Sequence, residues 1–216
     1  MKRSLFIGDV HGCYNEFAEI IELFGFVKGT DTLYQTGDII NKGPSVLKCI
    51  QLIEDLGIQC VLGNHEARLL KTLNTPKLEW TEKERERIKK IKELDFVSSV
   101  ISKWPLWIDT PEALLVHAGL EPFKEKLEDM SPDVLVSIRM WNSKPWYDLV
   151  HWHKPVVFGH WAKKGLLIRP LFKGLDSGCV YGKELTAWCP EEDRFYTVKA
   201  KKTYAEINKT AYSDLS

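Results

Sequence analysis

The sequence predicts an α/β fold, and three observations lead to that prediction. Short apolar runs alternate with amphipathic helical patterns over roughly the first 60 residues, as in βαβ units with right-handed crossovers. The runs are short and stop at turn residues such as Gly-Asp, as strands do. Polar residues able to bind ligands follow the ends of the runs, where ligands bind in parallel sheets.

The first three strands are separated by two helices. The strands are expected at Leu5 to Ile7, Thr32 to Thr36 and Ile58 to Leu62. The helix after the first strand has an apolar face and ends at Gly25, and Pro44 opens the helix after the second. These elements form two consecutive βαβ units.

The middle of the chain predicts one long, charged helix. A capping box begins at Thr81, apolar positions recur at helical spacing from Ile88 to Ile101, and Pro105 ends the helix. We expect one domain, 1–216, in which about 70–107 and 122–154 form a helical and loop cap over the cleft.

The second half supplies shorter elements. Strands are expected at Ala113 to Val116 and Val156 to Phe158, and a short helix starts at Ser131-Pro132. Gly174 to Val198 has the pattern of a meander of short strands. Past Lys199 the composition becomes polar, which predicts a loosely held terminus.

The composition limits the class of protein. Lys plus Arg and Asp plus Glu are 30 each, and a net charge of zero argues against stable nucleic-acid binding. The 5 cysteines form no C-x-x-C pair, as expected for reduced thiols in the cytoplasm. The apolar run after Lys2-Arg3 is too short for a signal peptide, and no run could span a membrane. We therefore expect a cytoplasmic protein without a membrane partner.

Five predicted strand ends carry residues that bind metal ions. Asp38 is at the centre of this pattern, because it ends the second strand in Gly37-Asp38. Any one of these residues alone is more often a turn, a helix cap or a buried histidine than a ligand. Five of them at strand ends favour one metal site at the edge of a sheet. The other candidates are Asp9 with His11, Asn64 with His65, His117, and His160.

The residue types indicate two divalent cations. Asp9 and His11 can reach one ion from a tight loop, and the two oxygens of Asp38 can bridge to a second. Oxygen and nitrogen ligands without thiolate suit manganese first, with iron, zinc, cobalt or nickel as alternatives. Two such ions clamp a phosphoryl group and lower the pKa of a water between them, which provides hydroxide near neutral pH.

The set of motifs resembles the calcineurin-like metallophosphoesterases, in the branch of phosphoprotein phosphatases and symmetrical diadenosine tetraphosphatases. The resemblance covers Leu5 to about Val198 and implies a four-layer sandwich of two mixed sheets flanked by helices. The motifs are GDVHG, GDIINKGP, GNHE, VHAGL and FGHW, and the run from Leu175 to Ala187 is similar to the tail of the tetraphosphatases.

The same resemblance assigns roles to residues. His65 is expected to be the general acid, and Asp38 and Asn41 complete the catalytic set. Lys42, Arg139 and Asn64 are expected to bind the substrate phosphates. One metal ion is assigned to Asp9, His11 and Asp38, and the other to Asp38, Asn64, His117 and His160.

The chain departs from the protein phosphatases after Asp38. They carry Asp-Arg-Gly where this chain has Asn41-Lys42-Gly43, so the carboxylate that orients the histidine and the arginine that forks onto phosphate are both replaced. A second side chain that binds the phosphate, which we call the phosphate clamp, is needed. Arg139 is the first candidate, although it could equally be a helix C-terminal charge, and Arg68 is the reserve.

The expected activity is symmetrical hydrolysis of dinucleoside tetraphosphates, with a small nucleotide as the substrate. The alternatives are a protein serine, threonine or tyrosine phosphatase, and a pyrophosphohydrolase of RNA 5′ ends or caps. A group of tryptophans could stack a base, although core packing is the more common role of such residues. The group comprises Trp141, Trp146, Trp152 and Trp161.

Overall fold

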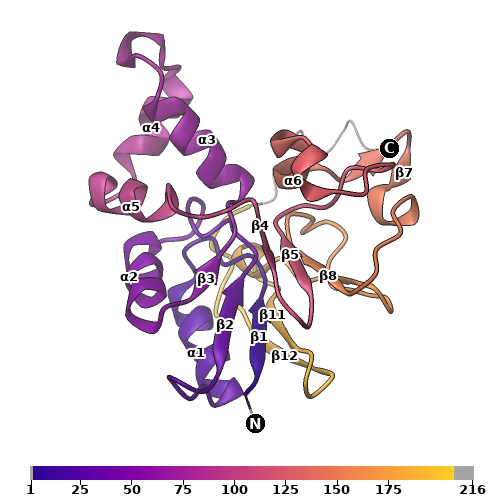
Figure 1. The fold of residues 1–216 in the computed structure, drawn as a ribbon. Coiled ribbons are helices and arrows are strands. Elements are labelled where there is room, and N and C mark those ends of the chain that lie inside the picture. Colours follow the sequence, from indigo (N-terminus) through magenta and orange to yellow (C-terminus); the bar gives the residue numbers. More distant parts are fainter. Residues whose placement is uncertain (1, 207–216) are drawn as a thin grey trace.

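Two five-stranded mixed sheets pack face to face, with helices on their outer sides (Figure 1). This computed structural model describes residues 2–206. The first sheet has the order β12-β11-β1-β2-β3 and the second β4-β5-β8-β10-β9. The expected α/β sandwich of two mixed sheets is confirmed.

The first sheet contains both βαβ units. Its strands are β1 (Ser4–Ile7), β2 (Thr32–Gln35), β3 (Gln59–Cys60), β11 (Glu184–Cys189) and β12 (Arg194–Lys199). β1 and β2 are parallel with Ser4 opposite Thr32, β2 and β3 are parallel, and β11 joins β1 antiparallel.

The second sheet is built from the middle and later parts of the chain. Its strands are β4 (Trp107–Asp109), β5 (Leu114–Val116), β8 (Val156–Phe158), β9 (Leu167–Ile168) and β10 (Phe172–Gly174). β5, β8 and β10 are parallel, and β4 and β9 are antiparallel edges. A separate hairpin comprises β6 (Met140–Trp141) and β7 (Lys144–Pro145).

Two helices cover the first sheet, three form an arm above it, and one lies beside the second sheet (Figure 1). The first two are α1 (Tyr14–Phe24) and α2 (Val46–Leu56). The arm comprises α3 (Asn64–Leu73), α4 (Glu82–Lys89) and α5 (Leu94–Ile101). The last is α6 (Pro132–Ser137), and the short 3₁₀ turns are η1 (Lys77–Glu79), η2 (Leu127–Asp129), η3 (Trp146–Asp148) and η4 (Cys179–Tyr181).

Alternation along the strands produces the layers. Leu5 and Ile7 pack among the helices, whereas Phe6 packs between the sheets. In β5, Leu115 faces the same middle layer and its two neighbours face the outer core of the second sheet. Because successive strand side chains point to opposite faces, each sheet contributes to two cores. Apolar burial on both faces holds the strand ends in place.

The prediction of one long helix after Thr81 is wrong. The capping box forms as expected between Thr81 and Glu84, but α4 ends at Lys89 and α5 begins at Leu94. Glu93, between them, has a φ of 51°. This left-handed residue redirects the chain so that the apolar face of α5 packs into the helical core.

The boundaries elsewhere differ little from the sequence pattern. α1 and α2 end at left-handed glycines, Gly25 and Gly57, as expected. The tail from Gly174 forms the turn η4 and the hairpin β11–β12 rather than a longer meander. Past Lys199 the chain contacts α1 through Glu16, and positions 207–216 of the expected loose terminus lie outside the described residues.

Among residues 2–206, no helix has the length and apolar character that crossing a membrane requires. All 5 cysteines are buried free thiols.

Candidate metal centre and active site

The polar candidates follow strand ends that meet at one edge of the two sheets. β1 ends before Asp9, β2 before Asp38, and α3 opens with Asn64 after β3. On the second sheet, β5 ends at Val116 before His117, and β8 ends before His160. The packing of the two sheets therefore brings residues from position 9 to position 160 together.

The loops that carry these residues have unusual backbone. Asp38, His11 and His160 have φ values of 57°, 46° and 66°, which non-glycine residues rarely adopt. Neighbouring backbone is equally tight: a Cβ at Gly159 would lie 1.8 Å from Asp9 Oδ1. Such geometry needs hydrogen bonds that hold it in place.

Glu66 holds the Asp38 loop. Its carboxylate accepts hydrogen bonds from the backbone N–H of Asp38 (2.9 Å) and of Ile40 (2.9 Å), and it is fully buried. His11 N in turn donates to Asp38 O at 2.8 Å, which joins the first two loops. The sequence analysis did not single out Glu66, although its place directly after His65 in GNHE was a usable signal.

The two aspartates are buried close to each other. Asp9 Oδ1 accepts from Thr36 Oγ1 (2.8 Å) and Oδ2 from His160 N (2.9 Å). Burial, together with the charges of Asp176 and Asp38, raises the pKa of Asp9 well above its usual range. For Asp38 burial acts in the same direction, but neighbouring histidines and Lys42 outweigh it and hold the pKa of Asp38 low. Adjacent buried carboxylates of this kind require positive charge nearby.

Three histidines have one ring nitrogen on a backbone carbonyl. His11 Nδ1, His117 Nδ1 and His160 Nε2 donate at 3.1, 2.7 and 3.0 Å. The opposite nitrogens therefore carry lone pairs that face the cluster. Burial lowers the pKa of all three, so the rings are neutral near pH 7, which is the form that binds metal. The accepting carbonyls belong to Ile40, Thr36 and Ser137.

These atoms fit divalent cations. Asn64 Oδ1 lies 3.1 Å from His117 Nε2 and 3.0 Å from His160 Nδ1, so acceptors face acceptors. His117 Nε2 is also 3.5 Å from Asp38 Oδ1. Turning the Asn64 amide would let its nitrogen donate to these atoms, but one amide cannot satisfy all of them. A cation among them satisfies the carboxylate, the amide oxygen and both imidazoles.

Two groups of ligand atoms share Asp38. Asp38, His117 and His160 form one group and His11, Asp38 and His65 the other, each with its ligand atoms within 4.8 Å of one another. Asp9 lies outside both groups, beside Asp38. The structure thus brings the predicted ligands to one place, with Asp38 common to both groups.

His65 lies at the edge of the centre. Its Nε2 is 3.9 Å from Asp38 Oδ2, and its ring meets that of His11 edge-on with centroids 4.9 Å apart. Burial is the main cause that lowers the pKa of His65 to about 4. Asn41 Nδ2 contacts His65 Nδ1 at 2.9 Å. An amide therefore contacts the histidine where related phosphatases are expected to carry a carboxylate.

The predicted phosphate ligands differ in their surroundings. Lys42 Nζ contacts His11 Nε2 at 2.8 Å and lies over the ring of Tyr181. Arg139 Nη2 donates to His160 O at 3.0 Å, and its Nε is buried without a partner among the described residues. Arg139 is therefore held against the predicted metal ligand His160 and has one N–H group without a partner among the described residues. Arg68, in contrast, is exposed on α3.

Asp176 is a further buried carboxylate that the sequence analysis did not select. It follows β10, accepts from Gly178 N at 3.2 Å, and is 6% exposed. Burial raises the pKa of Asp176 to about 6, and Asp38 acts in the same direction. Its position after the end of a strand was the available signal, since the other candidates share it.

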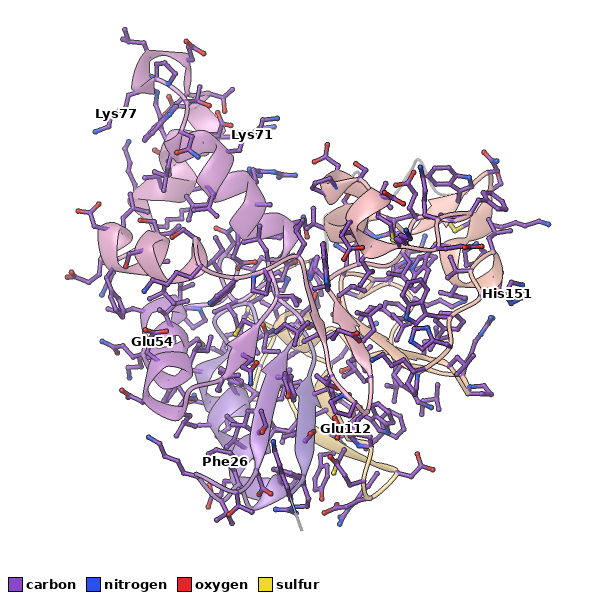
Figure 2. All side chains as sticks on the ribbon, viewed as in Figure 1. Phe26, Glu54, Lys71, Lys77, Glu112 and His151 are labelled. Carbon is purple, nitrogen blue, oxygen red and sulfur yellow. The ribbon has the colours of Figure 1, made fainter. Side chains whose placement is uncertain are left out.

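Three cavities lie around the centre, and we call the side chains that line them, apart from Asn41 and His65, the rim. The first, about 20 Å³, lies along α3 and α4 and includes Asn41 and His65. The second, about 190 Å³, follows the loop from Gly43 to Lys48. The third, about 280 Å³, lies at Met140 and Trp161. Figure 2 shows how densely the exposed side chains of the arm project, with Lys71 and Lys77 near its end.

Neutral imidazoles, carboxylates and an amide thus meet at the strand ends of a two-sheet sandwich and form a candidate metal centre. The calcineurin-like phosphoesterase family matches residues 2–185. This chain belongs to that family and is a hydrolase of phosphate esters or anhydrides, and the family uses divalent metal ions.

Two curated relatives are each named symmetrical bis(5'-nucleosyl)-tetraphosphatase. The protein from Glaesserella parasuis serovar 5 (strain SH0165) is 27% identical and aligns over 89% of this chain and 96% of its own. The protein from Haemophilus influenzae (strain PittEE) is 27% identical over 94% of this chain and 99% of its own.

Solved structures agree with the fold. A crystal structure of a candidate diadenosine tetraphosphatase superimposes with a TM-score of 0.82 at 32% identity, covering 92% of this chain and 93% of that one. A metallophosphoesterase from Sphaerobacter thermophilus, 14% identical, has a TM-score of 0.60 and covers 93% of this chain and 89% of its own. The second likeness concerns the fold alone.

Proposed function

We propose that this protein hydrolyses dinucleoside tetraphosphates symmetrically, converting diadenosine tetraphosphate and one water to two molecules of ADP. The observation that carries the chemistry is the sharing of Asp38 by two groups of converging ligand atoms. The names of relatives that align over nearly the whole chain support the substrate. The free, buried thiols support a reducing cytoplasm as the place of action.

The donor set supports two divalent cations, with manganese first and iron, zinc, cobalt or nickel as alternatives. When bound, the pair would supply positive charge for the phosphoryl oxygens and a water of lowered pKa. One ion is assigned to Asp9, His11 and Asp38, and the other to Asp38, Asn64, His117 and His160.

Arg139 and Lys42 would bind the phosphate oxygens, with Asn64 beside them. The buried Nε of Arg139 has no partner among the described residues, and a phosphate oxygen would provide one. Lys42 lies over the ring of Tyr181 beside the centre and offers a point charge, and it would give up its contact with His11 Nε2 when that nitrogen binds a metal ion. The positive charges of Arg139 and Lys42 would stabilise the pentacoordinate transition state, in which negative charge accumulates on these phosphate oxygens.

His65 has a low pKa in the free site, and the negative charge of a bound tetraphosphate would raise it so that the protonated ring donates to the oxygen of the departing ADP. Water forms a new bond to phosphorus as the P–O bond to that oxygen breaks. The proton from His65 Nε2 passes to the departing oxygen, and the proton that the attacking water loses passes to solvent and restores His65 after product release. Asn41 at 2.9 Å from His65 Nδ1 holds the ring, because an amide can turn to offer either its nitrogen or its oxygen. A placed general acid contributes about 10²–10⁴-fold.

The test is a substrate panel in manganese with purified protein. Diadenosine tetraphosphate should yield ADP as the sole nucleotide product, and a chelator should abolish turnover until manganese is restored. ATP plus AMP as products would contradict symmetrical cleavage.

A phosphopeptide and a capped RNA complete the panel. Brisk phosphopeptide turnover with slow ADP release would instead make the protein a phosphatase, an assignment that the Asn41-Lys42 replacement argues against. Faster hydrolysis of capped RNA than of diadenosine tetraphosphate would mean that the substrate is the triphosphate bridge of an RNA cap.

A further inference from the structure

An open cavity beside the second sheet has no part in the metal centre. It encloses about 280 Å³, close to the lower end of the size range of small-molecule sites. It lies between the β6–β7 hairpin and the turn after β8. Its lining residues are Met140, Pro145, Trp161, Lys163 and Lys164.

Two of these residues connect the cavity directly to the proposed phosphate site. Trp161 follows the predicted metal ligand His160, and Met140 follows Arg139. Arg139 also donates to His160 O at 3.0 Å, so the two chain segments are joined at this point. Since consecutive Cα atoms are about 3.8 Å apart, the backbone that carries two of the lining residues adjoins Arg139 and His160. The cavity is therefore within reach of a nucleoside attached to a phosphate at Arg139.

Trp161 forms one wall of this cavity. Its backbone N–H donates to Gly159 O at 2.8 Å, and its backbone carbonyl accepts from Lys164 N at 2.8 Å, so the turn that carries it is hydrogen-bonded. The indole lies beside the buried ring of Tyr147, with the two planes tilted and the centroids 6.2 Å apart. Unlike Trp146, which is fully buried in the same core, Trp161 is only half-buried. Part of its side chain is therefore available to a ligand.

The chemistry of the cavity fits a nucleoside. An indole provides a π-face on which a base can stack, an interaction worth about 1–3 kcal/mol per base. Met140 and Pro145 add apolar surface, and Lys163 and Lys164 add positive charge to the wall of the cavity. A polyphosphate with an aromatic base matches all three features, whereas a phosphoserine side chain would leave the indole unused.

We propose that this cavity binds the base of one nucleoside of the substrate, stacked on Trp161. The inference rests on the proposed function, because it requires a nucleoside polyphosphate at the metal centre. Every base has a π-face that can stack, so this contact recognises a nucleoside without strictly selecting adenine.

The experiment measures the affinity of ADP and of inorganic pyrophosphate by calorimetry in manganese. Trp161→Leu keeps an apolar side chain but removes the ring, and Trp161→Phe keeps a ring. Trp80→Ala is the control, since Trp80 is a half-buried tryptophan on the arm whose Nε1 donates to Thr75 O. We expect Trp161→Leu to weaken ADP binding about tenfold, with pyrophosphate within twofold of wild type. Trp161→Phe and Trp80→Ala should bind ADP within threefold of wild type.

Equal ADP affinity in Trp161→Leu and wild type would overturn the inference, and so would an equal loss for pyrophosphate. Hydrolysis of diadenosine tetraphosphate by the wild type tests the proposed function separately. If the wild type fails to cleave it while ADP binding depends on Trp161, the proposed function fails and the base site stands. If the wild type cleaves it and Trp161→Leu has an unchanged KM, the base site alone fails.

Discussion

The metal centre and the rim are built in opposite ways. In the centre, Asp38, His117 and His160 are buried, and backbone groups fix their loops and rings. On the rim, Arg68 and Arg87 are exposed on the arm. A rigid centre can perform one reaction on any phosphoryl group, whereas exposed side chains can distinguish what is attached to it. Substitutions in the two regions should therefore differ in kind.

The largest effect is expected for Asp38→Asn. The amide keeps the shape of the side chain but removes the charge shared by both ligand groups. Turnover should fall by more than about 100-fold on every phosphorylated substrate, since even residues that only support metal ligands cost about 10–100-fold. Metal content by mass spectrometry should fall as well. A normal rate on any substrate would contradict the role of Asp38 and the division between centre and rim.

His65→Asn should separate proton transfer from metal binding. We expect kcat to fall about 10²–10⁴-fold with metal content unchanged, because His65 would act as an acid rather than as a required ligand. The loss should shrink on an aryl phosphate whose leaving group needs no proton. Loss of metal from this variant would instead make His65 a ligand, as its place among the atoms of the His11 group allows.

Glu66→Gln tests how the centre is held. A glutamine offers one acceptor oxygen where two backbone N–H groups now donate, so one N–H loses its partner. The free energy of unfolding should fall by about 1–3 kcal/mol. Metal affinity should fall about 10–100-fold. Glu84→Gln on the arm is the matched control, because glutamine also completes a capping box, and it should behave as wild type.

The centre was largely predictable from the sequence because its residues follow a topological rule. Asp9, Asp38, His117 and His160 each follow a strand, and parallel strands end at one edge. Supporting contacts did not follow from that rule. The carbonyl of Thr36 that fixes His117 lies 81 positions away, and no local pattern connects the two.

The rim was less predictable, because its structure depends on tertiary packing. The arm, which carries the rim residues Arg68 and Arg87, breaks at Glu93, a left-handed residue that helix propensity does not anticipate. Trp146 and Trp161 were equivalent as sequence, yet Trp146 is fully buried and Trp161 lines a cavity. The difference arises from the hairpin and the turn that meet there, so burial could not be derived from residue type.

The smallest expected effect on catalysis concerns a carboxylate that has its own cation. Asp31 accepts from Arg3 Nη2 at 2.8 Å and from Val27 N at 3.1 Å, at the end of β1 remote from the centre. The Arg3 hydrogen bond lowers the pKa of Asp31. Asp31→Asn should leave kcat unchanged and lower the free energy of unfolding by about 1.5–3 kcal/mol at pH 7.

The pH dependence follows from the direction of the shift. A lowered pKa in the folded state stabilises the protein above the unfolded value, about 3.9, and the contribution is lost as pH falls through the folded value. Urea unfolding of both proteins should therefore give a constant difference from pH 7 to pH 5 and a narrowing one below about pH 4. A difference that grows on acidification would mean that the guanidinium does not stabilise this carboxylate. Asp31 would then depend on burial, as Asp9 does, rather than on a cation that the chain itself supplies.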